Sequence, residues 1–79
     1  MYREAGDRYA DSNMFFDAAR CYSKSKMWYE AGVYFEKAEM FDDAALAYKD
    51  GAFYEVVIDL VQRQVYYLLM LFDSSFYDL

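Results

Sequence analysis

Methionine recurs at a fixed interval of thirteen residues along most of this chain. It stands at Met1, Met14, Met27 and Met40, and Phe53 takes the next place. We number each thirteen-residue unit from 1 to 13, starting at this Met. In the first four units position 2 is aromatic, position 4 acidic, position 5 Ala and position 9 aromatic. A short, fixed period of this kind predicts structural units that stack on their neighbours.

A longer period of 26 residues overlies the shorter one. Position 6 alternates as Gly6, Ala19, Gly32 and Ala45, and residues 1–26 share ten identities with residues 27–52. Residues 1–13 share only four with residues 14–26. The repeating unit is therefore a pair of similar but non-identical halves, which is typical of a helical hairpin.

The spacing within each half predicts a helix. Positions 1, 2, 5, 6 and 9 are apolar or small, which places them on one helical face, and strict alternation is absent. Thirteen residues allow a helix of about nine or ten residues and a turn of about three. Asp11-Ser12-Asn13 and Asp50-Gly51 supply turn formers. We expect an all-α fold, a short α-solenoid of antiparallel helical hairpins, because each helix is too short to be stable alone.

Small and aromatic positions have separate expected roles. We expect positions 5, 6 and 9 to pack between helices, rather than to form an adaptable binding groove. These residues are Ala5, Gly6, Tyr9, Ala18, Ala19, Tyr22, Ala31, Gly32, Phe35, Ala44, Ala45 and Tyr48. The rings at position 2 are candidates for partner binding on a concave face. They are Tyr2, Phe15, Trp28 and Phe41.

Acidic residues recur near the expected helix starts. Asp17, Glu30 and Asp43 stand where a carboxylate stabilises the helix dipole. Glu36, Glu39 and Asp42 gather with Asp43 around one turn, and we expect them to form a solvated face rather than a cation site, which needs six to eight oxygen ligands.

Composition excludes several classes of function. The 79 residues include 14 acidic and eight basic ones, a net charge of -6, no His and one Cys. The absence of His excludes a hydrolase triad and a classical zinc finger. The acidic balance argues against a duplex nucleic-acid binder. We expect no catalytic activity, no cofactor and no metal.

Targeting and membrane signals are missing from the sequence. Charged residues begin at Arg3 and Glu4, which leaves no apolar region of a signal peptide. The most apolar run, residues 65–72 (VYYLLMLF), is much shorter than the roughly 20 residues that cross a bilayer. We expect a soluble intracellular protein, cytoplasmic or nuclear, without membrane contact.

The stretch EAGVYFEKAEMFDDAALAY resembles tetratricopeptide-like helical repeats over about residues 1–61. The unit here is 26 residues rather than 34. The shortened repeat looks like those of large fungal proteins related to UvrD-like superfamily 1 helicases, and of the animal tetratricopeptide- and ankyrin-repeat-containing helicase-like protein. Because no GxxxxGK[ST] segment is present, the resemblance implies no ATPase activity.

Two functional hypotheses follow. The first is a protein–protein interaction scaffold that binds a protein or peptide, or further repeats of a longer chain. The second is an orphan fragment or regulatory segment of a larger superfamily 1 helicase-type protein. We divide the chain into repeats at residues 1–61 and an apolar tail at residues 62–79. Residues 53–72 are expected to form one long helix that packs back as a cap, or else the tail is non-native. Residues 65–77 are candidates for self-association.

Overall fold

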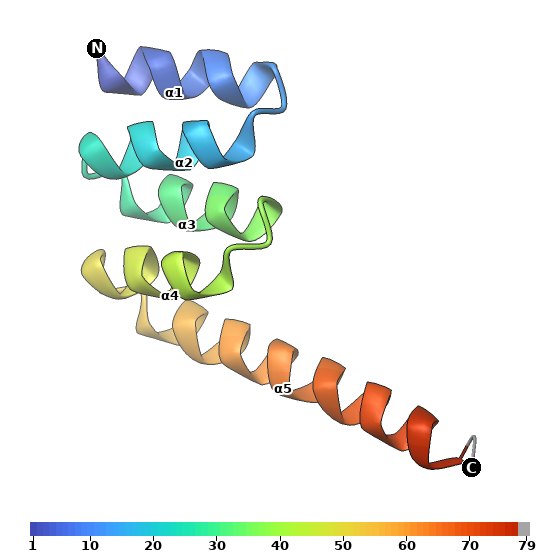
Figure 1. Cartoon of the computed structure of the whole chain (residues 1–79). Coiled ribbons are helices and arrows are strands. Elements are labelled where there is room, and N and C mark those ends of the chain that lie inside the picture. Colours follow the sequence, from blue (N-terminus) through green and yellow to red (C-terminus); the bar gives the residue numbers. More distant parts are fainter. Residues whose placement is uncertain (78–79) are drawn as a thin grey trace.

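The chain folds into a row of antiparallel helices. A computed structural model describes the backbone of residues 1–77 and the side chains of residues 1–73. This part contains α1 (Tyr2–Asp11), α2 (Phe15–Lys24), α3 (Trp28–Lys37), α4 (Phe41–Asp50) and α5 (Tyr54–Tyr77), and no strand. Figure 1 shows α1 to α4 side by side with alternating direction. The predicted all-α fold of helical hairpins is confirmed.

The row of helices is thin and open. Each helix packs on the one before it and the one after it, and the Cα atoms span 54 × 27 × 13 Å. The radius of gyration is 15.0 Å, where a compact chain of this length has about 12 Å. The accessible surface is 5970 Å², where a compact monomer of this mass exposes about 5,000 Å². The fold therefore presents an unusually large surface for its size.

The period of thirteen comes from a ten-residue helix followed by the same three-residue turn. At the end of α1 the Met14 N–H donates to the Tyr9 carbonyl at 2.8 Å. The Asn13 N–H donates to the Ala10 carbonyl at 3.0 Å. These two bonds define a Schellman motif, which satisfies carbonyls at the helix end.

The motif recurs after α2, α3 and α4, with bonds of 2.8 to 2.9 Å from position 1 to position 9 of the preceding unit. A Schellman motif usually brings these two side chains into apolar contact, which explains why positions 1 and 9 are both apolar. Each Met also stands directly before the next helix and makes no side-chain cap there. The acid at position 4 lies in the first turn of its helix, where it interacts favourably with the helix dipole.

Position 13 of each turn adopts a left-handed backbone. Asn13, Lys26, Glu39 and Ala52 have φ between 60 and 63°. Glycine would suit this conformation, yet Gly51 stands one position earlier with φ -88°. A Cβ on Gly51 would lie 2.6 Å from the Trp28 Cβ and 2.7 Å from the Phe53 ring. Close packing, and not the turn conformation, therefore requires glycine at that position.

Helix α5 is longer than the others because the turn does not recur. Val65 occupies position 13 of the fifth unit, and a β-branched residue strongly resists a positive φ. The helix consequently runs unbroken through residues 61 and 62, where we had divided the chain. Residues 78–79 of the predicted tail lie outside the described part, as do the side chains of residues 74–77.

The second half of α5 does not return to the array. It extends away from the other helices (Figure 1), and the eight side chains of residues 65–72 are 47 to 68% exposed. The expected packing of this segment as a cap is therefore not observed. Within residues 1–77 no helix combines the length and the apolar character needed to cross a membrane.

The core lies between neighbouring helices and is built mainly of small and aromatic side chains. Its buried apolar members are Ala18, Ala19, Tyr22, Ala31, Phe35, Ala44, Ala47, Tyr48 and Leu60. Gly6 and Gly32 are also buried, and Ala45 is half-buried. Tyr9 is exposed and Ala5 only half-buried, because α1 has a neighbouring helix on one side alone among the described helices.

Candidate interaction surface

One glycine–tyrosine contact joins the two helices of each hairpin. The Tyr22 ring of α2 lies against Gly6 of α1, where an added Cβ would stand 2.9 Å from Cε1. The Tyr48 ring of α4 covers Gly32 of α3 even more closely, since a Cβ added to Gly32 would stand only 2.6 Å from Cδ1 and closer still to Cε1. Position 6 therefore carries Gly in the first helix of each hairpin because the tyrosine of the second helix covers it.

Both tyrosine hydroxyls find a carboxylate on the preceding helix. Tyr22 donates to Asp7 Oδ1 at 2.6 Å, and Tyr48 donates to Glu36 Oε2 at 2.5 Å. The acceptors stand at positions 7 and 10 of their units, about one helical turn apart. A carboxylate at either position can therefore accept the hydrogen bond of the tyrosine at position 9 of the next helix. Burial raises the pKa of both phenols well above its ordinary value, and the bonds to the carboxylates raise it further.

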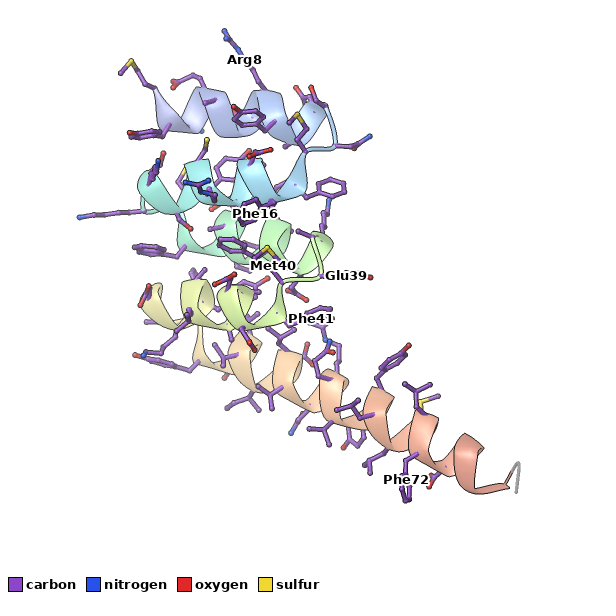
Figure 2. The ribbon with its side chains drawn as sticks, in the orientation of Figure 1. Arg8, Phe16, Glu39, Met40, Phe41 and Phe72 are labelled. Atoms are coloured by element: carbon purple, nitrogen blue, oxygen red, sulfur yellow. The ribbon has the colours of Figure 1, made fainter. Side chains whose placement is uncertain are left out.

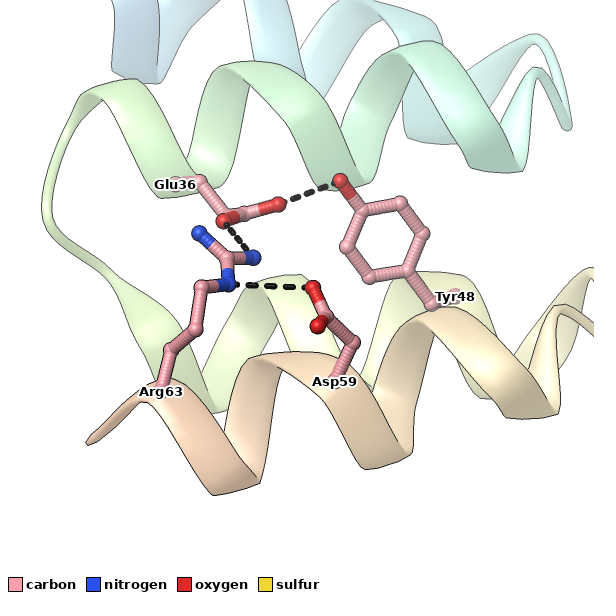
Figure 3. A network of polar contacts seen from close by, with 4 residues as sticks. All are labelled: Glu36, Tyr48, Asp59 and Arg63. Atoms are coloured by element: carbon pink, nitrogen blue, oxygen red, sulfur yellow. Dashed lines mark hydrogen bonds and ion pairs between the residues drawn. The ribbon is translucent and has the colours of Figure 1, made fainter. Parts of the chain in front are cut away.

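The second hairpin is tied to α5 by a polar network (Figure 3). Arg63 Nη2 donates to Glu36 Oε1 at 2.9 Å, and Arg63 Nε donates to Asp59 Oδ2 at 3.1 Å. The bond to Glu36 is the main cause that raises the pKa of Arg63. Glu36 thus joins α3 to both α4 and α5, and the prediction that it belongs to a solvated acidic face is wrong for this residue.

The four candidate rings at position 2 do not share one face. Because the helices alternate in direction, Tyr2 and Trp28 lie at one edge of the row, and Phe15 and Phe41 lie at the opposite edge. Tyr2 is exposed and the other three are half-buried. The structure therefore gives no concave surface lined by all four.

Two of the position-2 rings instead meet a lysine at the end of the following helix. Lys24 Nζ lies 5.2 Å from the centroid of Tyr2, and Lys37 Nζ lies 5.6 Å from that of Phe15. These lysines occupy position 11, which is also the position of Arg63 in the fifth unit. Cations at this separation are attracted by the ring faces, so the contacts hold the rings in place.

Phe41 differs from the other three because its ring lines a cavity. The cavity has a volume of about 400 Å³ and is lined by Glu39, Phe41, Arg63, Gln64 and Tyr67. We call it the α4–α5 hollow. A second cavity of about 300 Å³ shares Glu39 and Phe41 and adds Met40, Asp42 and Asp43. Figure 2 shows Glu39, Met40 and Phe41 together at the turn between α3 and α4, on the side toward which α5 extends.

The α4–α5 hollow contains two aromatic residues and lies beside a group of acidic residues. Phe41 and Tyr67 line the hollow together with the exposed Glu39. The exposed Asp42 and the half-buried Asp43 line the second cavity, which shares Glu39 and Phe41 with the hollow. We call Glu39, Asp42 and Asp43 the acidic rim. The charge of Arg63 is already paired with Glu36 and Asp59. The net charge of the chain, -6, adds to the negative field at this rim.

Sequence reasoning missed Arg63, Gln64 and Tyr67 as lining residues, because we placed them in a tail outside the repeats. The register offered a signal, since Arg63 stands at position 11 like Lys24 and Lys37, although Asp50 occupies this position in the fourth unit. Extending the thirteen-residue numbering past residue 61 would have placed Arg63 beside Phe41.

Cys21 is half-buried and free, and within the described residues no cluster of three or more Cys, Asp or Glu side chains is arranged to hold a metal ion. No protein-family model, curated protein or solved structure matches this chain. Function is therefore inferred from the geometry of the fold and of the α4–α5 hollow.

Proposed function

We propose that this protein is a helical-repeat interaction scaffold that binds a peptide segment of a partner protein in the α4–α5 hollow. The segment would insert one large apolar side chain and carry Lys or Arg beside it. The observation that supports this proposal is the combination of Phe41, Tyr67 and Glu39 in the hollow with Asp42 and Asp43 in the cavity that adjoins it.

The size and lining of the hollow suit such a segment. A volume of about 400 Å³ falls within the range of sites that enclose small ligands, about 300–1,000 Å³. Aromatic side chains in a desolvated pocket supply much of the binding energy at protein interfaces. The acidic rim would attract a basic partner and speed its association, with an effect that weakens as salt is added.

The architecture supports a binding role in a second way. The single row of helices exposes more surface than a compact chain of its mass, as repeat scaffolds do. The alternation of small and aromatic residues that underlies the resemblance to tetratricopeptide-like repeats forms the contacts within the row. These contacts leave the hollow at the end of the row open to a partner.

The proposal is tested by selecting binders from a displayed library of short random peptides on the immobilised full-length chain. We expect enriched peptides to combine an aromatic or large aliphatic residue with adjacent Lys or Arg. Their affinity is then measured by fluorescence anisotropy at low and high salt. Tyr67→Ala should weaken binding by at least about tenfold, the value of a lost apolar anchor.

Phe16→Ala is the matched control, because Phe16 is a partly exposed ring of α2 that does not line the hollow. It should leave the affinity unchanged. The proposal is refuted if no peptide is enriched, or if Phe16→Ala and Tyr67→Ala weaken binding equally.

A further inference from the structure

The second helix of each hairpin carries a phenylalanine at position 2, but the surroundings of the two rings differ. In the first hairpin, Lys37 of the next helix lies with Nζ 5.6 Å from the centroid of Phe15. In the second hairpin, the residue at position 11 of the next helix is Arg63, which lines the α4–α5 hollow beside Phe41. Its guanidinium is bonded to carboxylates of α3 and α5 instead (Figure 3). Among the side chains that the structure describes, no cation lies over the Phe41 ring.

The residues around the two rings also differ in charge. Position 13 of the turn before the ring is Asn13 in the first hairpin and Glu39 in the second. At position 3, an aromatic residue of the first hairpin is replaced by Asp42. Glu39 is exposed and lines the hollow with Phe41, and none of the ion pairs found in residues 1–73 includes it. The second hairpin therefore offers a ring and a carboxylate where the first has its own cation.

The presence of Arg63 does not make the hollow repel a cation. Arg63 brings one positive charge, while its partners Glu36 and Asp59 bring two negative charges. Glu39 adds another negative charge on the opposite side of the hollow's lining, in the turn before α4. The charges at the hollow thus sum to a negative value, and a cation that enters it is attracted.

We propose that the basic residue of the bound segment is a lysine whose side chain enters the α4–α5 hollow. Its ammonium group lies over the face of Phe41, as that of Lys37 lies over Phe15, and pairs with Glu39. A cation within about 6 Å of a ring centroid is attracted by the ring face. The apolar stem of the lysine packs along the lining of the hollow, in the way that long cationic side chains cover apolar surface.

Lysine fits the hollow better than arginine. The chain's own contacts between position 11 and a position-2 ring are made by ammonium groups, those of Lys24 and Lys37. A compact ammonium also pairs well with a single carboxylate, whereas the guanidinium fork suits two parallel acceptors. The inference rests on the proposed function, since it assigns a place to the basic residue of the same segment and leaves the Tyr67 side of the hollow for the large apolar side chain.

The test is an NMR titration of the full chain with N-acetyl-lysine N-methylamide. The matched probe is N-acetyl-norleucine N-methylamide, which has the same stem without the ammonium group. The ε-CH₂ protons of the lysine probe should shift upfield because they lie over a ring, and the backbone amide signals of Glu39 and Phe41 should move. At equal concentration the norleucine probe should cause less than about a third of these shifts, since it lacks both the cation–ring contact and the ion pair.

Two variants locate the cation, and a third is their control. Phe41→Leu keeps an apolar side chain but removes the ring, and Glu39→Gln removes the charge. Each should reduce the lysine-induced shifts about twofold or more. Phe15→Leu is the matched control and should leave them unchanged, because Lys37 already occupies the place over Phe15. Circular dichroism checks that the helices are retained in all three variants.

The inference is overturned if the lysine probe causes no shift, if the norleucine probe causes equal shifts, or if Phe15→Leu and Phe41→Leu reduce them equally. Failure of the proposed function gives a different result. A library that enriches no peptide, together with lysine shifts at Phe41, would refute peptide binding and leave the cation site. Enriched peptides that bind equally well after their lysine is replaced by norleucine would refute the cation site alone.

Discussion

Replacing Gly32 with Ala adds one methyl group at the closest contact between two helices. The new Cβ would lie 2.4 Å from Tyr48 Cε1 and 2.6 Å from Cδ1 and Cζ. The ring cannot move aside easily, because it is 1% exposed and its hydroxyl is bonded to Glu36. The change therefore forces α3 and α4 apart or breaks that hydrogen bond.

The expected change in the free energy of unfolding follows from two costs and one gain. Overpacking a well-filled core costs about 1–3 kcal/mol, and a lost hydrogen bond to a charged group costs about 1.5–3 kcal/mol. Alanine in a helix interior returns about 1 kcal/mol relative to glycine. We expect Gly32→Ala to lower the free energy of unfolding by about 2 kcal/mol, which lowers the melting temperature by about 8–16 °C for a domain of this size.

Urea and thermal unfolding followed by circular dichroism measure this loss. Gly6→Ala is the matched control, because its Cβ would stand 2.9 Å from Tyr22 Cε1 and needs a smaller adjustment. Its free energy of unfolding should lie within about 1 kcal/mol of the wild-type value, since the higher helix propensity of alanine offsets the strain. A Gly32→Ala chain that melts at or above the wild-type temperature would refute the packing we describe.

Three further predictions test the turns and the polar network. The free energy of unfolding of the wild type should fall above pH about 10, because the raised pKa keeps Tyr48 protonated in the folded chain while the unfolded phenol ionises. Urea unfolding from neutral to alkaline pH should show a smaller fall for Tyr48→Phe, and an equal fall would contradict this reasoning. Ala52→Gly should raise the free energy of unfolding in urea by about 0.5–1 kcal/mol, since it relieves a φ of 63°. An unchanged or lower value would argue against the left-handed turn. Glu36→Gln should lower the free energy of unfolding by about 2 kcal/mol, because bonds from Tyr48 and Arg63 converge on this half-buried carboxylate. Asp59→Asn should lower it by less than about 1 kcal/mol, because the pair of Asp59 with Arg63 is exposed. Equal losses would show that the bond to Tyr48 adds nothing.

The hairpin architecture was accessible from the sequence because it depends on local periodicity. Ten helical residues and three turn residues give the period of thirteen, and the small and aromatic positions mark the helix faces that pack. The expected long helix at the end of the array is also observed, as α5, and it has a local cause, since Val65 stands where each earlier turn needs a positive φ. The expectation that this helix packs back as a cap is wrong, since the side chains of residues 65–72 are exposed.

The candidate site was far less accessible. The position-2 rings look equivalent in the sequence, yet alternating helix direction sends Phe15 and Phe41 to one edge and Tyr2 and Trp28 to the other. Phe41 borders a cavity with Arg63 and Tyr67, because α5 continues past it. The acidic residues Glu39 and Asp42 distinguish the surroundings of Phe41 from those of Phe15, but they do not reveal the cavity.

Helices α1 to α4 and the turns between them follow from local patterns in the sequence, since they depend on contacts between residues at most five apart along the chain. The packing of the helices in space sets which carboxylate each buried tyrosine reaches. It also brings Glu36 to Arg63, 27 residues further on, and leaves the side chains of residues 65–72 exposed. These features depend on how neighbouring helices cross and where each helix ends in space, which a period along the chain does not encode.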